Sequence, residues 1–175
     1  FGGKSKIWSN RTLHEIVSKH MLATPRVVLV DLHTGLGPYG HGECIMNESI
    51  DSDAYKRARK WWGNTVKSTT AGESSSPDIT GSLKYAFARM FGPNTEVTAL
   101  SLEFGTYDPP EVFFAMQAEN WMHNHGKKDD PRAGQIKSEM RRVFYPDSDH
   151  WKRMVWARAN YVVDQALVNM IGEPQ

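Results

Sequence analysis

Two nearly continuous apolar runs dominate the hydrophobic pattern of the chain, at residues 26–32 and 96–104. Runs of this kind predict strands that are covered on both faces, as in the parallel sheets of α/β proteins. The first run ends at His33 and passes into a glycine-rich turn over residues 34–40, whereas the second ends in Glu103 and its apolar neighbours. Because functional groups collect at the carboxyl ends of such strands, both strand ends are candidate positions for chemistry.

Helical periodicity, capping residues and prolines predict helices around these strands. They are expected over residues 11–22, 51–66, 83–91, 109–125, 135–144 and 150–171. The chain is therefore expected to be a single helix-rich α/β domain over residues 1–175. Two strands alone rarely form a stable sheet, so either residues 43–50 and other short segments add strands, or the rest of the sheet lies upstream of Phe1. Residues 69–77, rich in serine and threonine, are expected to form a mobile surface loop.

The composition excludes several classes of function. With 21 basic and 20 acidic residues, the formal net charge of +1 argues against a dedicated nucleic-acid surface. The single cysteine, Cys44, excludes an internal disulfide and a zinc site built from cysteines, and it fits a reducing compartment. No apolar stretch approaches the roughly 20 residues that span a bilayer, and no secretion leader is indicated. We therefore expect a cytoplasmic protein with no membrane and no nucleic-acid partner.

His33 and Glu103 have the strongest sequence context among the candidate functional residues. The glycines that follow His33 would let the backbone approach a ligand closely. Glu103 lies between two apolar residues, which suggests a partly dry pocket where desolvation raises the pKa of a carboxyl toward the range of a general base. Each residue alone also fits a structural role, as a polar strand end or as the partner of a lysine. At one edge of a sheet, the pair suggests metal-assisted hydrolysis.

Other candidate residues carry less weight. His14 and His20 resemble a zinc protease signature, but their spacing of six residues would not let the two imidazoles converge on one ion. His41 and Glu43 could ligate a metal, face a substrate or be exposed. A metal-free hydrolase would need a nucleophile, and Cys44 is the only thiol, with no orienting third group evident. No phosphate-binding glycine loop and no nucleophilic serine signature is present.

The segments around both candidates are distinctive in combination. Residues 31–43 have the sequence DLHTGLGPYGHGE, and residues 102–107 have the sequence LEFGTY. Together they resemble an uncharacterised bacterial branch of the zinc carboxypeptidase-like proteins. That group includes the metallocarboxypeptidases and the succinylglutamate desuccinylase and aspartoacylase deacylases. The resemblance extends over most of the chain, including residues 8–13, 120–121 and 144–146.

This resemblance implies a fold and a site. The fold would be a mixed sheet flanked by helices, and the activity would be zinc-dependent hydrolysis of amide bonds in a small peptide or an acylated amino acid. His33 matches the third zinc ligand of the family, and Glu103 matches the general base that activates the water on the metal. Three protein ligands leave one zinc position open for water, whose pKa falls to about 7 when bound. We expect the following residues to contact the substrate: Thr34, Tyr39, His41 and Tyr107.

The chain departs from the family pattern in its other zinc ligands. The family's first two ligands form a His-x-x-Glu motif before the third, but here His14 is followed at i+3 by Val17, and His20 by Ala23. The chain is therefore expected to be the C-terminal part of a carboxypeptidase-like catalytic domain, with the remaining zinc ligands upstream of residue 1. Residues 1–175 by themselves are expected to bind zinc weakly. The alternative is a metal-free remnant of the fold that acts as a binding or interaction module. An apolar sheet edge left open would favour a homo-oligomer or another partner.

Overall fold

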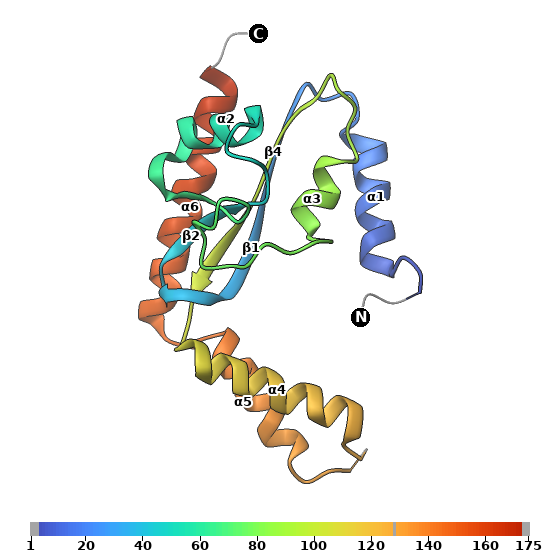
Figure 1. Cartoon of the computed structure of the whole chain (residues 1–175), viewed down its shortest axis with the longest axis vertical. Coiled ribbons are helices and arrows are strands. Elements are labelled where there is room, and N and C mark those ends of the chain that lie inside the picture. The colour runs from blue at the N-terminus through green and yellow to red at the C-terminus, as the bar shows by residue number, and fades with distance from the viewer. Residues whose placement is uncertain (1–3, 128, 173–175) are drawn as a thin grey trace.

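The chain folds into a four-stranded mixed sheet with helices on both sides, seen in a computed structural model that describes residues 4–127 and 129–172 (Figure 1). This architecture confirms the α/β class predicted from the sequence. In chain order, the elements of the described part are α1 (Trp8–His20), β1 (Arg26–Tyr39), β2 (Gly42–Met46), α2 (Asp53–Trp62), the short 3-10 helix η1 (Gly63–Thr65), β3 (Val66–Ser68), α3 (Leu83–Ala88), β4 (Glu96–Gly105), α4 (Pro109–His125), α5 (Ala133–Phe144) and α6 (Asp149–Gly172).

Strand β4 lies inside the sheet, whose strand order is β1-β4-β2-β3. It pairs in parallel with β1 and antiparallel with β2, and β2 in turn pairs in parallel with β3. The two apolar runs of the sequence are therefore neighbouring strands, as predicted. Residues 43–50 supply most of β2, whereas the three residues of β3 were not predicted. These two short strands complete a sheet that β1 and β4 would not stabilise by themselves.

The alternation of side chains along β4 gives the sheet two different faces. Leu100, Leu102 and Phe104 belong to the larger core, which α2 and α6 cover. Ala99 belongs to a smaller core on the opposite face, with residues of α1 and α3. Figure 1 shows α2 and α6 on one side of the sheet and α1 and α3 on the other. Glu103 continues the second face toward the carboxyl end of β4, where the packing becomes polar.

The glycine-rich segment after His33 is part of a strand and not the open turn that its composition predicted. Strand β1 continues to Tyr39, with an irregular register between Thr34 and Tyr39. Gly35 and Gly37 adopt φ angles of +136° and +96°, which residues with a Cβ rarely adopt. A Cβ built on Gly35 would also lie 2.8 Å from the ring of Phe144. The glycines thus let the chain bend locally without leaving the sheet, as in a β-bulge.

Strand β1 was predicted to be buried on both faces. The prediction holds only in part, because β1 is one of the two edge strands of the sheet. Val27 and Leu29 pack on the side of α1 and α3, and Val28 and Val30 pack on the side of α6. Leu32, further along, is 60% exposed. The outer edge of β1 pairs with no strand among residues 4–127 and 129–172. The aliphatic run therefore reflects cover by helices on two faces, at a strand whose outer edge faces no other strand of the described residues.

The helices follow the predicted order, with ends shifted by a few residues. Ser52 caps α2 by accepting a hydrogen bond from the Tyr55 amide at 3.2 Å, as its sequence position predicted. Two prolines after Asp108 begin α4. Helices α4 and α5 form a hairpin that projects from the carboxyl end of the sheet (Figure 1). Within the described part of the chain, no helix is both long and apolar enough to span a bilayer.

Gly105 joins the end of β4 to three other segments. Its carbonyl accepts hydrogen bonds from the Gly40 amide at 2.8 Å and from the Trp151 indole Nε1 at 3.0 Å, and its amide donates to the His41 carbonyl at 3.1 Å. A Cβ at this position would lie 2.0 Å from the carbonyl oxygen of Pro38. Only glycine fits this junction without a shift of the backbone, and the junction fixes the strand two residues after Glu103.

We expect Gly105→Ala to lower the free energy of unfolding by about 1–3 kcal/mol, because the new methyl group meets backbone that has no room to move. The matched control is Gly134→Ala in α5, where a Cβ meets nothing within 4 Å. That change should be neutral or stabilising by up to about 1 kcal/mol, since alanine favours helix. Denaturant unfolding followed by circular dichroism measures both values. Equal stability of the two variants would contradict this account of the junction.

Candidate functional site

A row of three ionisable side chains crosses the sheet near the carboxyl end of β4. The register pairs Glu103 with His33 on β1 and with Glu43 on β2. Residues directly opposite each other on neighbouring strands point to the same face. Two residues earlier, Ser101 of β4 pairs with Asp31 in the same way. The sheet therefore presents two polar layers on the face that α1 and α3 cover only in part.

His33 lies between two carboxylates. Its Nε2 is 2.7 Å from Oδ2 of Asp31, and its Nδ1 is 4.0 Å from Oε2 of Glu103. The side chain of His33 is 49% exposed, so the imidazole can be reached from solvent. When the proton resides on Nε2, the bond to Asp31 fixes the ring and leaves the lone pair of Nδ1 directed toward Glu103.

Glu103 is the buried member of the row, with 7% of its surface exposed. Its Oε1 accepts a hydrogen bond from the Leu36 amide at 3.1 Å. Burial raises the pKa of the Glu103 carboxyl, and the nearby charge of Glu43 adds to this rise. The Leu36 amide, His33 and Lys84 oppose it without reversing it. The carboxyl is thus held above its usual pKa, in the direction that suits a general base.

Lys84 of α3 is a buried cation beside the row, and the sequence analysis did not single it out. Only 6% of the residue is exposed, and its Nζ donates to Oγ of Ser101 at 3.1 Å. Burial lowers the pKa of Lys84, while the charges of Glu48, Asp31 and Glu103 partly restore it. The sequence does contain a signal for this burial. Lys84 comes three residues before the buried Phe87, and this spacing places the lysine on the apolar face of a short helix.

Glu43 ties a loop to the sheet at the level of Glu103. Its carboxylate accepts hydrogen bonds from the Ser75 amide at 3.1 Å and from Oγ of Ser75 at 2.7 Å. The segment over residues 69–77 has neither helix nor strand, as predicted. A second contact holds it, because the hydroxyl of Tyr55 donates to Glu73 at 3.1 Å. The sequence left Glu43 open as a metal ligand. In the structure its carboxylate holds the loop through Ser75.

Among the expected substrate-contacting residues, the structure brings Tyr39 and Tyr107 together. Oγ1 of Thr34 donates to the carbonyl of Phe144 at 2.7 Å, and His41 lies exposed in the turn after β1. The rings of Tyr39 and Tyr107 meet edge to face, with their centroids 6.4 Å apart. The guanidinium of Arg142 lies over the Tyr107 ring at 4.4 Å. These side chains form an aromatic pair between β1 and the start of α4, and their role toward a substrate stays a prediction.

Among the described side chains that could bind zinc, only His33 has surroundings typical of a zinc ligand. A metal-bound imidazole commonly donates its second N–H to a carboxylate, and the contact between His33 and Asp31 has this form. Structural and catalytic zinc sites use three or four protein ligands. Residues 4–127 and 129–172 contain no group of three histidine, cysteine, aspartate or glutamate side chains that could hold a metal ion. The described residues thus contain no complete zinc site, and the role of His33 as a ligand, with Asp31 as its orienting carboxylate, stays a prediction.

Cys44 does not have the surroundings of a nucleophile. It is fully buried on β2, one residue after Glu43, and it belongs to the core on the α6 face. Burial raises the pKa of its thiol, although Arg158 partly opposes the rise. Reactive cysteines need a lowered pKa and some exposure. The geometry therefore gives no support to a thiol-based hydrolase with His33 as its base.

Comparison with known proteins gives a family but not an activity. No curated protein and no solved structure matches the chain. The model of the DUF2817 family, described as proteins of unknown function, matches residues 1–158. This range includes the three strands of the row, β1, β2 and β4, and α6 as far as Arg158. Because the match extends over most of its length, the chain belongs to the DUF2817 family.

Proposed function

We propose that this chain contributes the general base and one metal-binding imidazole to a site that hydrolyses amide bonds. The observation that carries the proposal is the meeting of Glu103 and His33 at the carboxyl edge of two paired parallel strands. The carboxylate is buried and the imidazole is accessible. The substrate class, a small peptide or an acylated amino acid, follows from the resemblance to zinc carboxypeptidase-like proteins.

The two oxygens of Glu103 have different surroundings. Oε1 is occupied by the Leu36 amide, which fixes the orientation of the carboxylate. Oε2 faces Nδ1 of His33 at 4.0 Å, too far for a hydrogen bond between them. Oε2 is therefore the oxygen left to accept a proton. Its position on a central strand, held at Gly105, keeps it fixed relative to the imidazole.

In the proposed reaction, Glu103 acts first as a base and then as an acid. Oε2 takes a proton from a water molecule whose oxygen bonds to the carbonyl carbon of the amide. The carboxylic acid of Glu103 then gives that proton to the amide nitrogen as the carbon–nitrogen bond breaks, which leaves a carboxylic acid and a free amine; transfer of the acid's proton to the amine gives the carboxylate and the ammonium ion. Zinc, when bound, would supply a Lewis acid that lowers the pKa of water to about 7. His33 would hold it through Nδ1, with further ligands outside the described residues.

A second candidate function is a non-catalytic binding or interaction module. It is favoured by the absence of a complete group of metal-binding side chains in the described part of the chain. In this case the chain would keep the fold of the hydrolase without its metal. The polar row, formed by His33, Glu103 and Glu43, would be a remnant of the former site. The two functions differ in zinc content and in the effect of Glu103, both of which can be measured.

We expect Glu103→Gln to lower kcat/KM for amide hydrolysis by about 10²- to 10⁴-fold, because glutamine cannot accept the proton. The measurement needs the protein extended upstream to the start of its reading frame and a panel of short peptides and N-acyl amino acids. The matched control is Glu15→Gln, an exposed position on α1, which should leave kcat/KM unchanged. Equal rates for the wild type and Glu103→Gln would exclude Glu103 as the base.

The same carboxyl should make the stability of the fold depend on pH. Because burial raises its pKa above 4.5, the folded chain keeps a proton on Glu103 that the unfolded chain has already released. Folding stability associated with this group is therefore lost as the pH rises from about 4.5 through the raised pKa. Relative to wild type, Glu103→Gln should gain stability between about pH 4 and about pH 8. Denaturant titrations at both pH values measure this, with Glu15→Gln as the control, and a loss over that interval would refute it.

Zinc content separates the two candidate functions. The chain of residues 1–175 should hold well below one zinc per molecule, and the upstream-extended protein should hold about one, measured by elemental analysis. In the extended protein, Asp31→Asn should weaken zinc binding about 10- to 100-fold, since it removes the partner of His33. Asp51→Asn, at an exposed position before α2, is the control. Tight zinc in residues 1–175 alone would contradict the ligand assignment, and its absence from both proteins would favour the binding module.

A further inference from the structure

Lys84 and Glu48 are ionisable groups that the proposed reaction does not use. Lys84 is 6% exposed, and its Nζ donates to Oγ of Ser101 at 3.1 Å, although an ammonium group has three N–H donors. Oε2 of Glu48 is buried and has no hydrogen-bond partner among residues 4–127 and 129–172. Buried polar groups in native proteins are nearly always hydrogen-bonded. The described part of the chain thus contains a buried acceptor without a donor and a buried cation with unused N–H groups.

The start of α3 brings these two groups together. Oγ of Ser82, the residue before α3, donates to Oδ1 of Asn47 at 3.4 Å, which places the first turn of the helix beside the segment that carries Glu48. Burial lowers the pKa of Lys84, and the charge of Glu48 gives the largest opposing effect. Burial raises the pKa of Glu48, and the charge of Lys84 opposes this rise. The groups are therefore neighbours, yet within the described residues no hydrogen bond or ion pair joins them.

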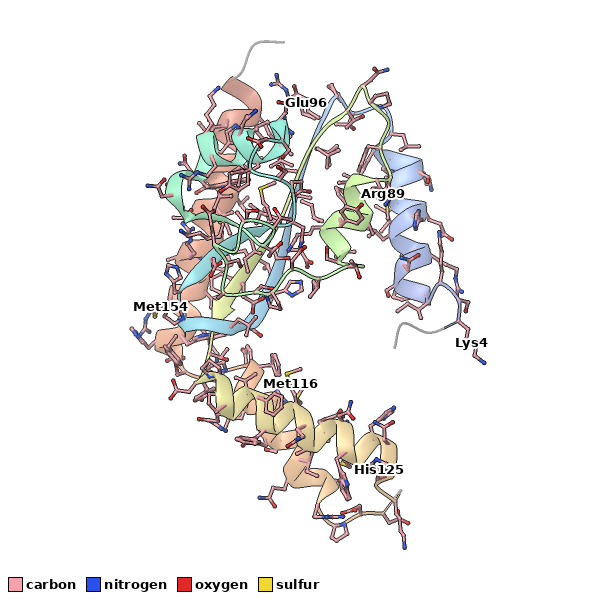
Figure 2. The ribbon with its side chains drawn as sticks, viewed as in Figure 1. Lys4, Arg89, Glu96, Met116, His125 and Met154 are labelled. Atoms are coloured by element: carbon pink, nitrogen blue, oxygen red, sulfur yellow. The ribbon has the colours of Figure 1, made fainter. Side chains whose placement is uncertain are left out.

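Lys84 lies one layer of side chains below Glu103. Ser101, its hydrogen-bond partner, is the second residue before Glu103 on β4, so the two layers share a face and lie about 7 Å apart. Figure 2 shows Glu96 at the start of β4 and Arg89 at the end of α3, both toward the upper part of the view. The first turn of α3 and the carboxyl end of β4 therefore both lie lower. A substrate that reaches Glu103 comes within the length of a side chain of Lys84.

The charges around Lys84 favour a neutral partner. Besides Glu48, the carboxylates of Asp31, Glu103 and Asp78 act on Lys84 through their charges. An added anion would be repelled by these carboxylates, whereas an added cation would leave the N–H groups of Lys84 unused. A primary carboxamide is neutral and offers both missing interactions. Its oxygen can accept a hydrogen bond from Lys84, and its NH₂ group can donate one to Glu48.

We propose that Lys84 and Glu48 make the site specific for substrates whose side chain next to the scissile amide ends in a carboxamide, as in glutamine. The inference rests on the proposed function, because it places the scissile amide at Glu103. Glutamine spans the distance between the two layers better than asparagine, whose side chain is one methylene shorter. A site built to hydrogen-bond a substrate group rejects analogues without that group far more strongly than an apolar pocket rejects a difference in size.

The kinetics of the upstream-extended protein test this specificity. The substrates are the N-acetyl derivatives of glutamine, glutamate, methionine and alanine. We expect kcat/KM for the glutamine derivative to exceed that for the methionine derivative, which is similar in size, at least about 100-fold. The glutamate derivative should be a poor substrate. Equal rates for glutamine and alanine, or a preference for methionine or glutamate, would overturn the inference and leave the proposed function intact.

Two variants separate recognition from a merely structural role. Lys84→Met keeps an unbranched side chain without its N–H donors, so it should lower kcat/KM for the glutamine derivative at least about tenfold and raise it for the methionine derivative. Glu48→Gln removes a repelling charge and should raise kcat/KM for the glutamate derivative at least about tenfold. Lys56→Met, exposed on α2, is the control and should change none of these values. Equal losses for all derivatives in both variants would contradict the inference.

Binding to residues 1–175 gives a readout that does not depend on catalysis. In ¹³C-labelled protein, millimolar N-acetyl-glutamine should shift the NMR signal of the Lys84 ε-methylene group, which is assigned by its loss in Lys84→Met. N-acetyl-methionine should not shift it. Binding of the glutamine derivative without hydrolysis of any derivative by the extended protein would refute the proposed function and support the recognition. No shift with N-acetyl-glutamine, or an equal shift with both compounds, would overturn the inference whatever the activity.

Discussion

The pairing of β4 with a strand on each side is the constraint on which the rest of the structure depends. Every residue from Thr98 to Gly105 is buried, and the register with β1 and β2 decides which side chains share a face. A slip of one residue would turn Glu103 into the core of α2 and α6 and turn Leu102 or Phe104 toward Lys84. The large apolar core on one face thus holds the polar row in place on the other.

The polar row is kept at a cost in stability. Two ionisable groups, Glu103 and Lys84, are buried on the same face, and the pKa of each is shifted toward its neutral form. Each charge opposes the shift of the other, so together they are less costly than either would be alone. A core designed for stability would replace both with apolar residues. Groups that oppose stability in this way are concentrated at functional sites.

Local patterns were sufficient to predict β1 and β4 and the meeting of His33 with Glu103. Each apolar run identified its own strand, and parallel strands bring their carboxyl ends to one edge. The burial of Glu103 was also expected, but for a different reason. Its apolar sequence neighbours, Leu102 and Phe104, point to the opposite face, and the Leu36 segment together with the central position of β4 keeps the carboxyl from water.

The remaining parts of the site depend on contacts between distant residues. Lys84 reaches Ser101 across 17 positions, and Ser75 reaches Glu43 across 32. Neither pair leaves a periodic signal in the sequence. The segment after His33 was interpreted as a turn because it is rich in glycine. The same glycines instead allow an irregular strand, since pairing of Tyr39 with Gly105 outweighs the local preference.

The hydrogen bond from the Trp151 indole to the Gly105 carbonyl joins residues 46 positions apart. The segment between them, residues 106–150, therefore leaves the body of the molecule and returns to it at almost the same place. The entropy of closing such a loop grows only slowly with its length. Over evolution, the far end of the α4–α5 hairpin can lengthen, shorten or change its sequence while Glu103 stays where it is. The hairpin is in this sense a module, free to diversify on a fixed frame.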